Sequence, residues 1–325
     1  MAGGRASVSP GAPGRAAGAR GEPGAPLPAP PVGAPTLAWV PAPVLFVTGA
    51  VTQYVGSGLA VLLFAVVPVP GVTWLRVVAG AAVLLAWRRP WQASWTRGTL
   101  LEAAAFGCVL AAMNLTFYEA IDRLPLGTTV AIEFCGPVAV AALGSRGRRD
   151  AAALALAAAG VALLADVHIA GSPLGVALAL VAGGCWAGYV VLGHRVSTAR
   201  GLRAQDGLAF GMACGALALT PVGLLDGAAQ AVAVPWRLAA GLGVGVLSSA
   251  VPYALEQVAM RRLPRARFAL LLALLPATAA VVGAVVLGQV PALLELVGIG
   301  LVCGAAGLRS HQGPPRVSAG EGPGP

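Results

Sequence analysis

The chain has 325 residues, of which 58% are hydrophobic and only 10% are charged, and its mean hydropathy is +0.82. Soluble proteins of this size have about 25% charged residues, so the composition excludes an ordinary soluble enzyme and favours a protein surrounded by lipid. The net charge is +9 and all 21 basic residues are arginine, so the chain has neither a Walker A loop nor a lysine for a Schiff base, and we expect no direct ATP drive.

Both ends of the chain are predicted to be disordered tails. Residues 1–40 are rich in Pro, Gly and Ala, and no apolar run follows their arginines closely as it would in a signal peptide. Such a segment cannot bury enough apolar surface to offset its chain entropy, and residues 310–325 have the same character.

Ten apolar segments lie between the tails. Each has about 17 to 24 residues, the length that an α-helix needs to cross the hydrocarbon core of a bilayer. Short proline-containing breaks separate several of them, as in tight helical hairpins. The sequence therefore predicts an all-α integral membrane protein with ten transmembrane helices, at residues 44–67, 71–87, 99–119, 126–144, 150–166, 174–193, 206–225, 237–259, 266–287 and 291–308.

The arginines test this count. With ten helices, every arginine cluster falls on one side of the membrane, and only Arg123 and Arg237 lie on the other. Cytoplasmic loops are enriched in basic residues, so we expect a multi-pass membrane protein with both termini in the cytoplasm. The clusters are Arg88/Arg89/Arg97, Arg146/Arg148/Arg149, Arg195/Arg200/Arg203, Arg261/Arg262/Arg265/Arg267 and Arg309/Arg316.

The two halves of the membrane region are similar to each other. A shift of 139 residues aligns Arg123 with Arg262 and Pro137 with Pro276. Each half holds five helices, and this odd number makes the second half enter the bilayer from the opposite side. The result is an inverted-topology repeat, which is typical of secondary transporters. We expect one repeat at residues 44–166 and the other at 174–308; chance similarity between Ala/Leu-rich segments is the alternative.

Glu133 is a candidate functional residue. It lies about 10 Å into the predicted fourth helix, at 1.5 Å per residue. Pro137 follows four residues later and has no N–H to bond the Glu133 carbonyl. A carboxyl group beside a loosened helical turn near mid-membrane is suited to hold a substrate ammonium group or a proton. The alternative is a neutral glutamic acid with a structural hydrogen bond.

Other polar and aromatic residues are candidates to line a cavity with Glu133. Arg76, about a third of the way into the second predicted helix, either snorkels to the outer interface or binds a carboxylate through its fork of donors. For the others, interhelical hydrogen bonding or an interfacial aromatic belt is the alternative role. They share helix faces in pairs: Gln53 with Ser57, Asn114 with Tyr118, Trp186 with Tyr189, and Tyr253 with Glu256.

Little in the sequence favours catalysis or metal binding. The five cysteines stand singly in apolar stretches, and His168, His194 and His311 fall between the predicted helices or in the tail. We expect no metal, no cofactor, no catalytic residue and no nucleic-acid partner.

Several remaining features are expected to be structural. Glu119 and Glu256 are expected near the membrane interfaces, and Glu102 and Glu295 near helix starts, where the helix dipole stabilises a carboxylate. Three GxxxG patterns, at residues 184–188, 211–215 and 300–304, would let helices approach closely. With 45 glycines in the chain, such patterns are expected often and have little specificity.

An ordered series of motifs runs through the membrane region. The motifs are Gly71-Val-Thr-Trp-Leu-Arg76, Met113-Asn-Leu-Thr-Phe-Tyr118, Leu124-Pro-Leu-Gly127, Ala131-Ile-Glu-Phe-Cys-Gly-Pro137, Gly184-Cys-Trp-Ala-Gly-Tyr189, Leu247-Ser-Ser-Ala-Val-Pro-Tyr253 and Arg262-Leu-Pro264. This series resembles the threonine/homoserine exporter family of the EamA-type drug/metabolite transporter superfamily. The resemblance extends from about Val44 to Leu308, nearly the whole predicted membrane region.

The resemblance implies a ten-helix inner-membrane protein with two EamA repeats that exports small amino acids or related metabolites, with proton antiport. Glu133 and Arg76 match the family's helix 4 glutamate and helix 2 arginine, and matching polar or aromatic positions are Asn114, Tyr118, Trp186 and Tyr253. The implied partners are a small-molecule substrate, a proton and the lipid bilayer, with a homodimer left open. The mechanism we expect is alternating access.

The chain departs from the family's pattern at three places. Members of the family often carry a lysine late in the first helix, where this chain reads Leu59-Ala-Val-Leu-Leu-Phe64. Leu275 precedes the helix 9 proline and Gln289 follows Gly288, where the family commonly has glutamate. With leucine at position 275, Glu133 becomes the main candidate for a proton site. The alternative function is a drug or metabolite exporter of the same fold with a cargo other than an amino acid.

Overall fold

The computed structural model describes residues 39–143, 147–169, 171–199, 202–263 and 265–310. The predicted tails fall outside these residues, except for their innermost positions. All regular secondary structure in the described ranges is helical. The prediction of an all-α protein is therefore confirmed for this part of the chain.

The helices follow the ten predicted segments one for one. Three segments are interrupted: the fourth is α4 (Leu126–Glu133) and α5 (Cys135–Leu143), the eighth is α10 (Pro235–Gly245), the π-helical turn η2 (Val246–Ala250) and α11 (Val251–Arg262), and the ninth is α12 (Arg265–Leu272) and α13 (Leu275–Leu287). Short helices η1 (Pro90–Gln92) and α9 (Ala228–Val232) lie in connections. The other segments are single helices: α1 (Ala42–Phe64), α2 (Val69–Arg88), α3 (Arg97–Ile121), α6 (Arg148–Ile169), α7 (Pro173–Thr198), α8 (Ala204–Leu225) and α14 (Leu293–Ser310).

Eight helices of the described chain are long and apolar enough to cross a bilayer. Two further apolar helices, Leu126–Val140 and Leu293–Leu308, are shorter. The multi-pass membrane fold is thus confirmed. The helices extend past the apolar runs, so the prediction that His168 and His194 lie between helices is wrong. His168 is in the last turn of α6, and His194 lies within α7, just before its last turn.

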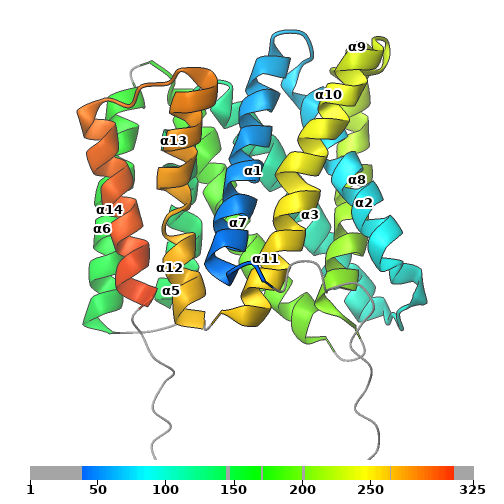
Figure 1. Cartoon of the computed structure of the whole chain (residues 1–325), viewed down its shortest axis with the longest axis horizontal. Coiled ribbons are helices and arrows are strands. Elements are labelled where there is room, and N and C mark those ends of the chain that lie inside the picture. Colours follow the sequence, from blue (N-terminus) through cyan, green and yellow to red (C-terminus); the bar gives the residue numbers. More distant parts are fainter. Residues whose placement is uncertain (1–38, 144–146, 170, 200–201, 264, 311–325) are drawn as a thin grey trace, which may run out of the picture. The chain divides into compact units, whose positions relative to one another are not determined.

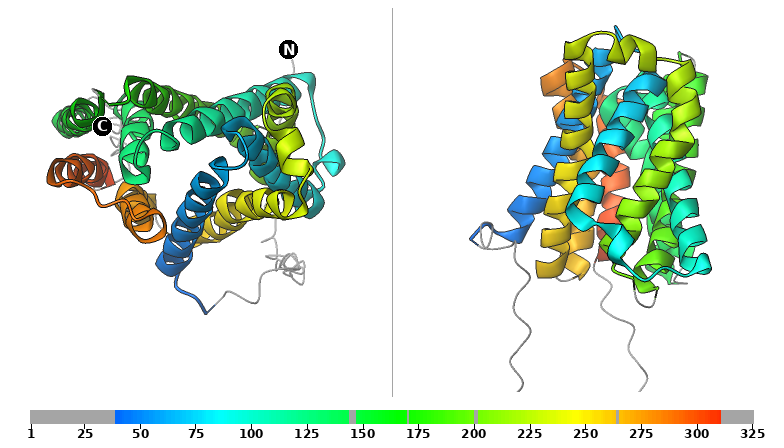
Figure 2. Two further views of the ribbon diagram at one scale, coloured as in Figure 1. Left: turned by 90° about the horizontal axis from the view of Figure 1, so that it is seen from above. Right: turned by 90° about the vertical axis from the view of Figure 1, so that its right-hand side faces the viewer.

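The helix contacts follow the same pattern in both halves of the bundle. α1 packs against α11 and α13, and its counterpart five spans later, α7, packs against α3 and α4. Equivalent helices also pair with each other: α6 lies beside α14, and α2 beside α8 on the other side of the bundle (Figures 1 and 2). The break at Phe134 has a counterpart 139 residues later, between α12 and α13. This is the packing that an inverted repeat would produce.

The arginine clusters gather at one end of the bundle. The described arginines of the clusters lie at or next to the C-terminal ends of α2, α7, α11 and α14 and the N-terminal ends of α3, α6, α8 and α12, and these helix ends lie at the lower end in Figure 1. At this end Arg88 Nη2, in the last turn of α2, lies 3.1 Å from Asp206 Oδ1 in the first turn of α8. Each charge also suits the dipole of its helix end, so the ion pair ties the two halves together there.

Only some of the glycines in the GxxxG patterns lie at close contacts between helices. A Cβ on Gly211 would lie 2.9 Å from the Ala103 carbonyl oxygen, and one on Gly215 2.6 Å from that of Gly107, so α3 and α8 pack backbone against backbone. A Cβ on Gly184 or Gly300 would meet no atom within 4 Å. Of the three GxxxG patterns, only that at 211–215 thus places both glycines at a close helix contact.

Candidate substrate-binding site

A small polar cavity lies among α1, α2, α3, α4 and α7. Its volume is about 50 Å³. Larger hollows between α1 and α13 and between α1 and α10 are lined by no charged residue. A cavity of about 150 Å³ between α4, α13 and α14 is lined by Glu295, but the carboxylate of Glu295 is already bonded to Thr128, His168 and Ala292. The small cavity is therefore the better candidate for chemistry. Five of the eight residues predicted for the site line it, namely Gln53, Arg76, Asn114, Glu133 and Trp186, together with Tyr54, Met113 and Phe117.

Glu133 is the last residue of α4, and the helix breaks at the next residue. The loosened turn predicted from Pro137 is therefore confirmed. The break packs against Gly183 of α7, where a Cβ would lie 2.8 Å from the Glu133 carbonyl oxygen. The Glu133 side chain is buried. Its carboxyl group lies within electrostatic range of Arg76 but forms no hydrogen bond or ion pair with any residue of the described chain. An ionised carboxylate without a partner is costly at this depth, so this group needs a proton or a bound cation.

Arg76 is also buried, on α2. Its Nε donates to Ser249 Oγ and its Nη2 to the Ser248 carbonyl oxygen, each at 3.4 Å. That carbonyl has no helical N–H partner four residues on, because Pro252 stands there. The guanidinium carbon lies 4.7 Å from the centroid of the Tyr118 ring, a cation–π contact. Arg76 is thus held inside the bundle and does not snorkel to the interface.

The remaining predicted residues lie outside the cavity wall. Tyr118 is fully buried beneath Arg76. Tyr189 stacks on Phe106, with ring centroids 4.9 Å apart, and Tyr253 packs on the apolar cluster between α2, α3 and α8. The prediction that Tyr118, Tyr189 and Tyr253 line the cavity is therefore not met, because helix spacing fixes a shared face but not the neighbour that this face meets.

Sequence reasoning missed three residues of the site. Tyr54 lines the cavity, and Ser248 and Ser249 hold Arg76. Pro252 is the signal that could have identified Ser248, as Pro137 did for Glu133. Glu256, expected at the interface, is half-buried within electrostatic range of Tyr54, Tyr189 and Tyr253.

A second polar cluster lies at the end of the bundle opposite the arginine clusters. Glu295 Oε1 accepts from Thr128 Oγ1 at 3.0 Å and lies 2.6 Å from His168 Nε2, while Oε2 accepts from the Ala292 N–H. These bonds join α4, α6 and α14. The expected position of Glu295 at a helix start is confirmed, and the hydrogen bonds show what it connects.

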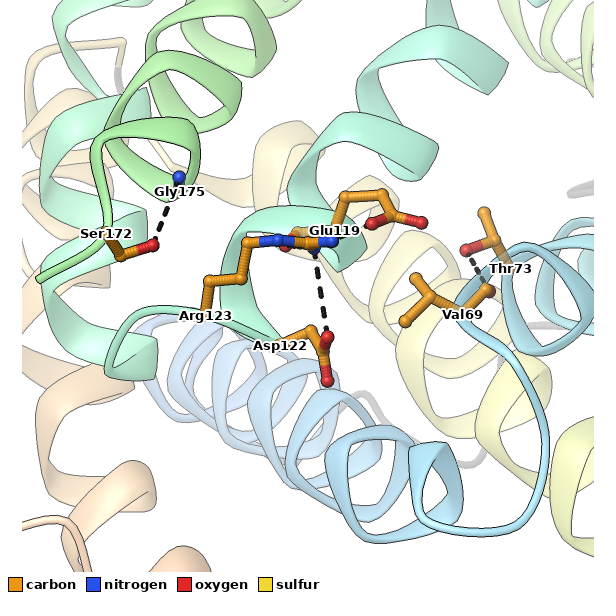
Figure 3. Close-up of polar contacts among 7 residues, drawn as sticks. All are labelled: Val69, Thr73, Glu119, Asp122, Arg123, Ser172 and Gly175. Carbon is orange, nitrogen blue, oxygen red and sulfur yellow. Dashed lines mark hydrogen bonds and ion pairs between the residues drawn. The ribbon is translucent and has the colours of Figure 1, made fainter.

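Arg123 lies at the same end, in the α3–α4 connection. Its Nη1 is 2.7 Å from Glu119 Oε2 and 3.8 Å from Asp122 Oδ2, and Figure 3 shows the three side chains together. Ser172 Oγ accepts from the Gly175 N–H and so caps α7 nearby (Figure 3). This cluster is partly exposed, so it adds little stability.

The size of the cavity limits what it holds. A cavity needs about 10–15 Å³ to hold one water molecule. The cavity of about 50 Å³ therefore accommodates a few waters or one charged group of a substrate. A whole amino acid requires α1, α2, α3, α4 and α7 to move apart.

Known proteins resemble this chain over most of its length. The threonine/homoserine exporter RhtA of Escherichia coli (strain K12) is 37% identical over 276 residues, which cover 82% of this chain and 90% of that protein. The chain belongs to the threonine/homoserine exporter family. A second member, RhtA of Salmonella typhimurium (strain LT2), is 38% identical over 259 residues, covering 77% of this chain and 84% of that protein.

Two further comparisons agree with this assignment. Residues 173–310, from α7 to α14, match the EamA-like transporter family. A crystal structure of another protein, 18% identical, has a TM-score of 0.55 and covers 82% of this chain and 96% of that chain, so it shares the fold. The protein is therefore a multi-pass protein of the inner membrane.

Leu275 and Gln289, two of the departures expected from the family resemblance, have different surroundings. Leu275 is buried at the start of α13 and does not line the cavity. Gln289 Oε1 accepts from the Leu126 N–H at 2.9 Å. Pro125, at the N-cap of α4, supplies no side-chain acceptor, so Gln289 accepts the hydrogen bond that a capping side chain would otherwise accept. A glutamate at this position would also have an acceptor oxygen.

Replacing Gln289 with leucine is expected to lower the free energy of unfolding by about 0.5–2 kcal/mol, the usual effect of losing a helix cap. Gln289→Glu keeps an acceptor oxygen and should melt close to the wild type. The unfolding midpoints of the detergent-purified variants measure this difference. Equal midpoints for the leucine and glutamate variants would show that the cap contributes nothing.

Proposed function

We propose that this protein exports small amino acids such as threonine and homoserine across the inner membrane, in exchange for protons. The named relatives support this class of substrate. The observation that carries the proposal is that two groups of opposite charge, Arg76 and Glu133, line one buried cavity without pairing with each other. A zwitterionic amino acid has the two complementary charges.

In this proposal Glu133 couples the two fluxes. Its carboxylate binds the substrate ammonium group. After release the buried carboxyl group takes up a proton, because it forms no hydrogen bond or ion pair with the described residues. One carboxyl group that holds either a cation or a proton, but not both, makes the two species exchange.

Alternating access is the proposed motion. We assign residues 44–166 and 174–308 to two inverted repeats that rock against each other, with the arginine-rich end and both termini in the cytoplasm. The helix contacts that recur in both halves support this division. The cavity lies between α7 and four helices of the first half, so movement of one half against the other would open it.

A different cargo on the same fold is the second candidate. A phosphorylated cargo is disfavoured, because it needs several buried cations and Arg76 is the only buried arginine of the described chain. An apolar drug would leave both charges of the cavity unpaired.

Export from cells tests the proposed function. Overexpression should raise extracellular threonine and homoserine and protect cells from growth-inhibiting homoserine, and deletion should do the reverse. An unchanged extracellular amino acid pool, with raised resistance to lipophilic cations, would instead support the second candidate.

A further inference from the structure

Buried polar atoms without a partner gather around Arg76. In the described chain, four buried side-chain nitrogen or oxygen atoms make no hydrogen bond: Arg76 Nη1, Tyr118 Oη, Ser248 Oγ and Arg237 Nε. The first three belong to residues that are 5%, 0% and 2% exposed. Native proteins rarely leave such atoms unpaired, so the group needs an explanation.

These three residues meet at one guanidinium group. Tyr118 lies under it, with its ring centroid 4.7 Å from Arg76 Cζ. Ser248 accepts from Arg76 Nη2 through its carbonyl oxygen at 3.4 Å. With Nε bonded to Ser249, the π-helical turn η2 holds two of the three guanidinium nitrogens and leaves Nη1 free.

Local backbone structure positions Ser248. A π-helical turn inserts one residue into a helix and is frequent at functional sites, and η2 brings two consecutive serines toward α2. Gly56 of α1 gives the room: a Cβ there would lie 2.3 Å from Ser248 Oγ.

We propose that Arg76 Nη1, Tyr118 Oη and Ser248 Oγ form a binding subsite for the carboxylate of the transported amino acid. This inference rests on the proposed function. The arginine donates only, and both hydroxyl groups can donate, so the three suit the lone pairs of a carboxylate. Arg76 lies within electrostatic range of Glu133 but forms no ion pair in the described chain, so its unbonded Nη1 is available to an anion. Arg76 lines the same cavity as Glu133, so the ammonium group of a substrate held by Arg76 reaches Glu133 there. Tyr118 and Ser248 lie behind Arg76, outside the cavity wall, and meet the carboxylate once the helices move apart to admit the substrate.

The subsite makes a free carboxylate a requirement of transport. Threonine amide keeps the ammonium and hydroxyl groups of threonine but lacks the carboxylate. In proteoliposomes with labelled threonine counterflow, unlabelled threonine should compete at least about tenfold better than the amide, since a hydrogen bond to a charged group is worth about a factor of ten or more.

Two variants each remove one oxygen atom from the subsite. Ser248→Ala and Tyr118→Phe should each reduce the preference for threonine over the amide about tenfold and leave competition by the amide unchanged. Thr73→Val is the matched control, because the buried Thr73 hydroxyl already donates to the Val69 carbonyl within α2 (Figure 3); this variant should keep the wild-type preference. A variant too slow for counterflow is measured through the shift of its unfolding midpoint by the same two compounds.

The possible outcomes distinguish a failure of the carboxylate subsite from a failure of the proposed exporter function. If the wild type transports threonine but the amide competes equally, or if both variants keep the wild-type preference, the carboxylate subsite is wrong while the exporter stands. If the wild type shows no threonine counterflow, the proposed function fails, and this inference fails with it.

Discussion

Replacing Glu133 with glutamine is expected to lower threonine efflux driven by a pH gradient by about 10- to 150-fold. Glutamine has nearly the same size, but its amide group neither takes up nor releases a proton near neutral pH. It also cannot form a charge-assisted hydrogen bond to an ammonium group, and losing such a bond costs about 1.5–3 kcal/mol. Efflux of labelled threonine from proteoliposomes with an acidic exterior measures the change.

Glu102→Gln is the control for this experiment. Glu102 is half-buried near the start of α3 and does not line the cavity, so its replacement should leave efflux near the wild-type rate. Undiminished gradient-driven efflux in the Glu133→Gln variant would refute the role assigned to this carboxyl group.

Replacing Gly107 with alanine is expected to lower the free energy of unfolding by about 1–3 kcal/mol or more, as overpacking does. The added Cβ would lie 1.8 Å from the Gly211 carbonyl oxygen, and this contact is between two helix backbones, which must move apart. The unfolding midpoint of the detergent-purified variant should fall by several degrees.

Gly300→Ala is the matched control for this variant. No atom lies within 4 Å of a Cβ at Gly300, so alanine should stabilise α14 by up to about 1 kcal/mol through its higher helix propensity. The account of the α3–α8 contact would be contradicted by a Gly107→Ala variant that melts at or above the wild-type midpoint.

The spans and their order could be predicted because the bilayer imposes a length and an apolar composition on each helix. The one-sided arginine clusters and the break after Glu133 also followed from local signals: charge, and a proline without an N–H. Helix ends were less predictable, since a helix continues past its apolar run where a polar side chain finds a partner, as His168 in the last turn of α6 does with Glu295.

Neighbours across helices were the harder part. Tyr189 shares a helix with Trp186, yet it stacks on Phe106 and only Trp186 reaches the cavity. The π-helical turn shifts the register of the eighth span by one residue, and this shift decides that Ser248 and Ser249 meet Arg76. Such contacts depend on the rotation and register of two helices, which no single helix encodes.

Dependence on a neighbouring helix also explains why only one of the three GxxxG patterns forms a close contact. The glycines at 211 and 215 meet the backbone of α3, whereas Gly300 faces no atom of the described chain within 4 Å. Small residues permit close packing, but a partner helix must lie on that face for the contact to form.

The central claim is that one cavity, between two halves of opposite orientation, opens in turn to each side of the membrane. Its most direct test is a single cysteine at Met113, which lines the cavity, in a variant lacking the five native cysteines. A membrane-impermeant maleimide should label this cysteine both in whole cells and in inverted vesicles, and threonine should protect it on each side.

A cysteine at Leu217 on α8, a residue that is 72% exposed and lines none of the cavities described above, is expected to face lipid and should stay unlabelled in both preparations. Labelling of the Met113→Cys variant from one side only, under every substrate and pH condition, would contradict alternating access to the Arg76–Glu133 cavity.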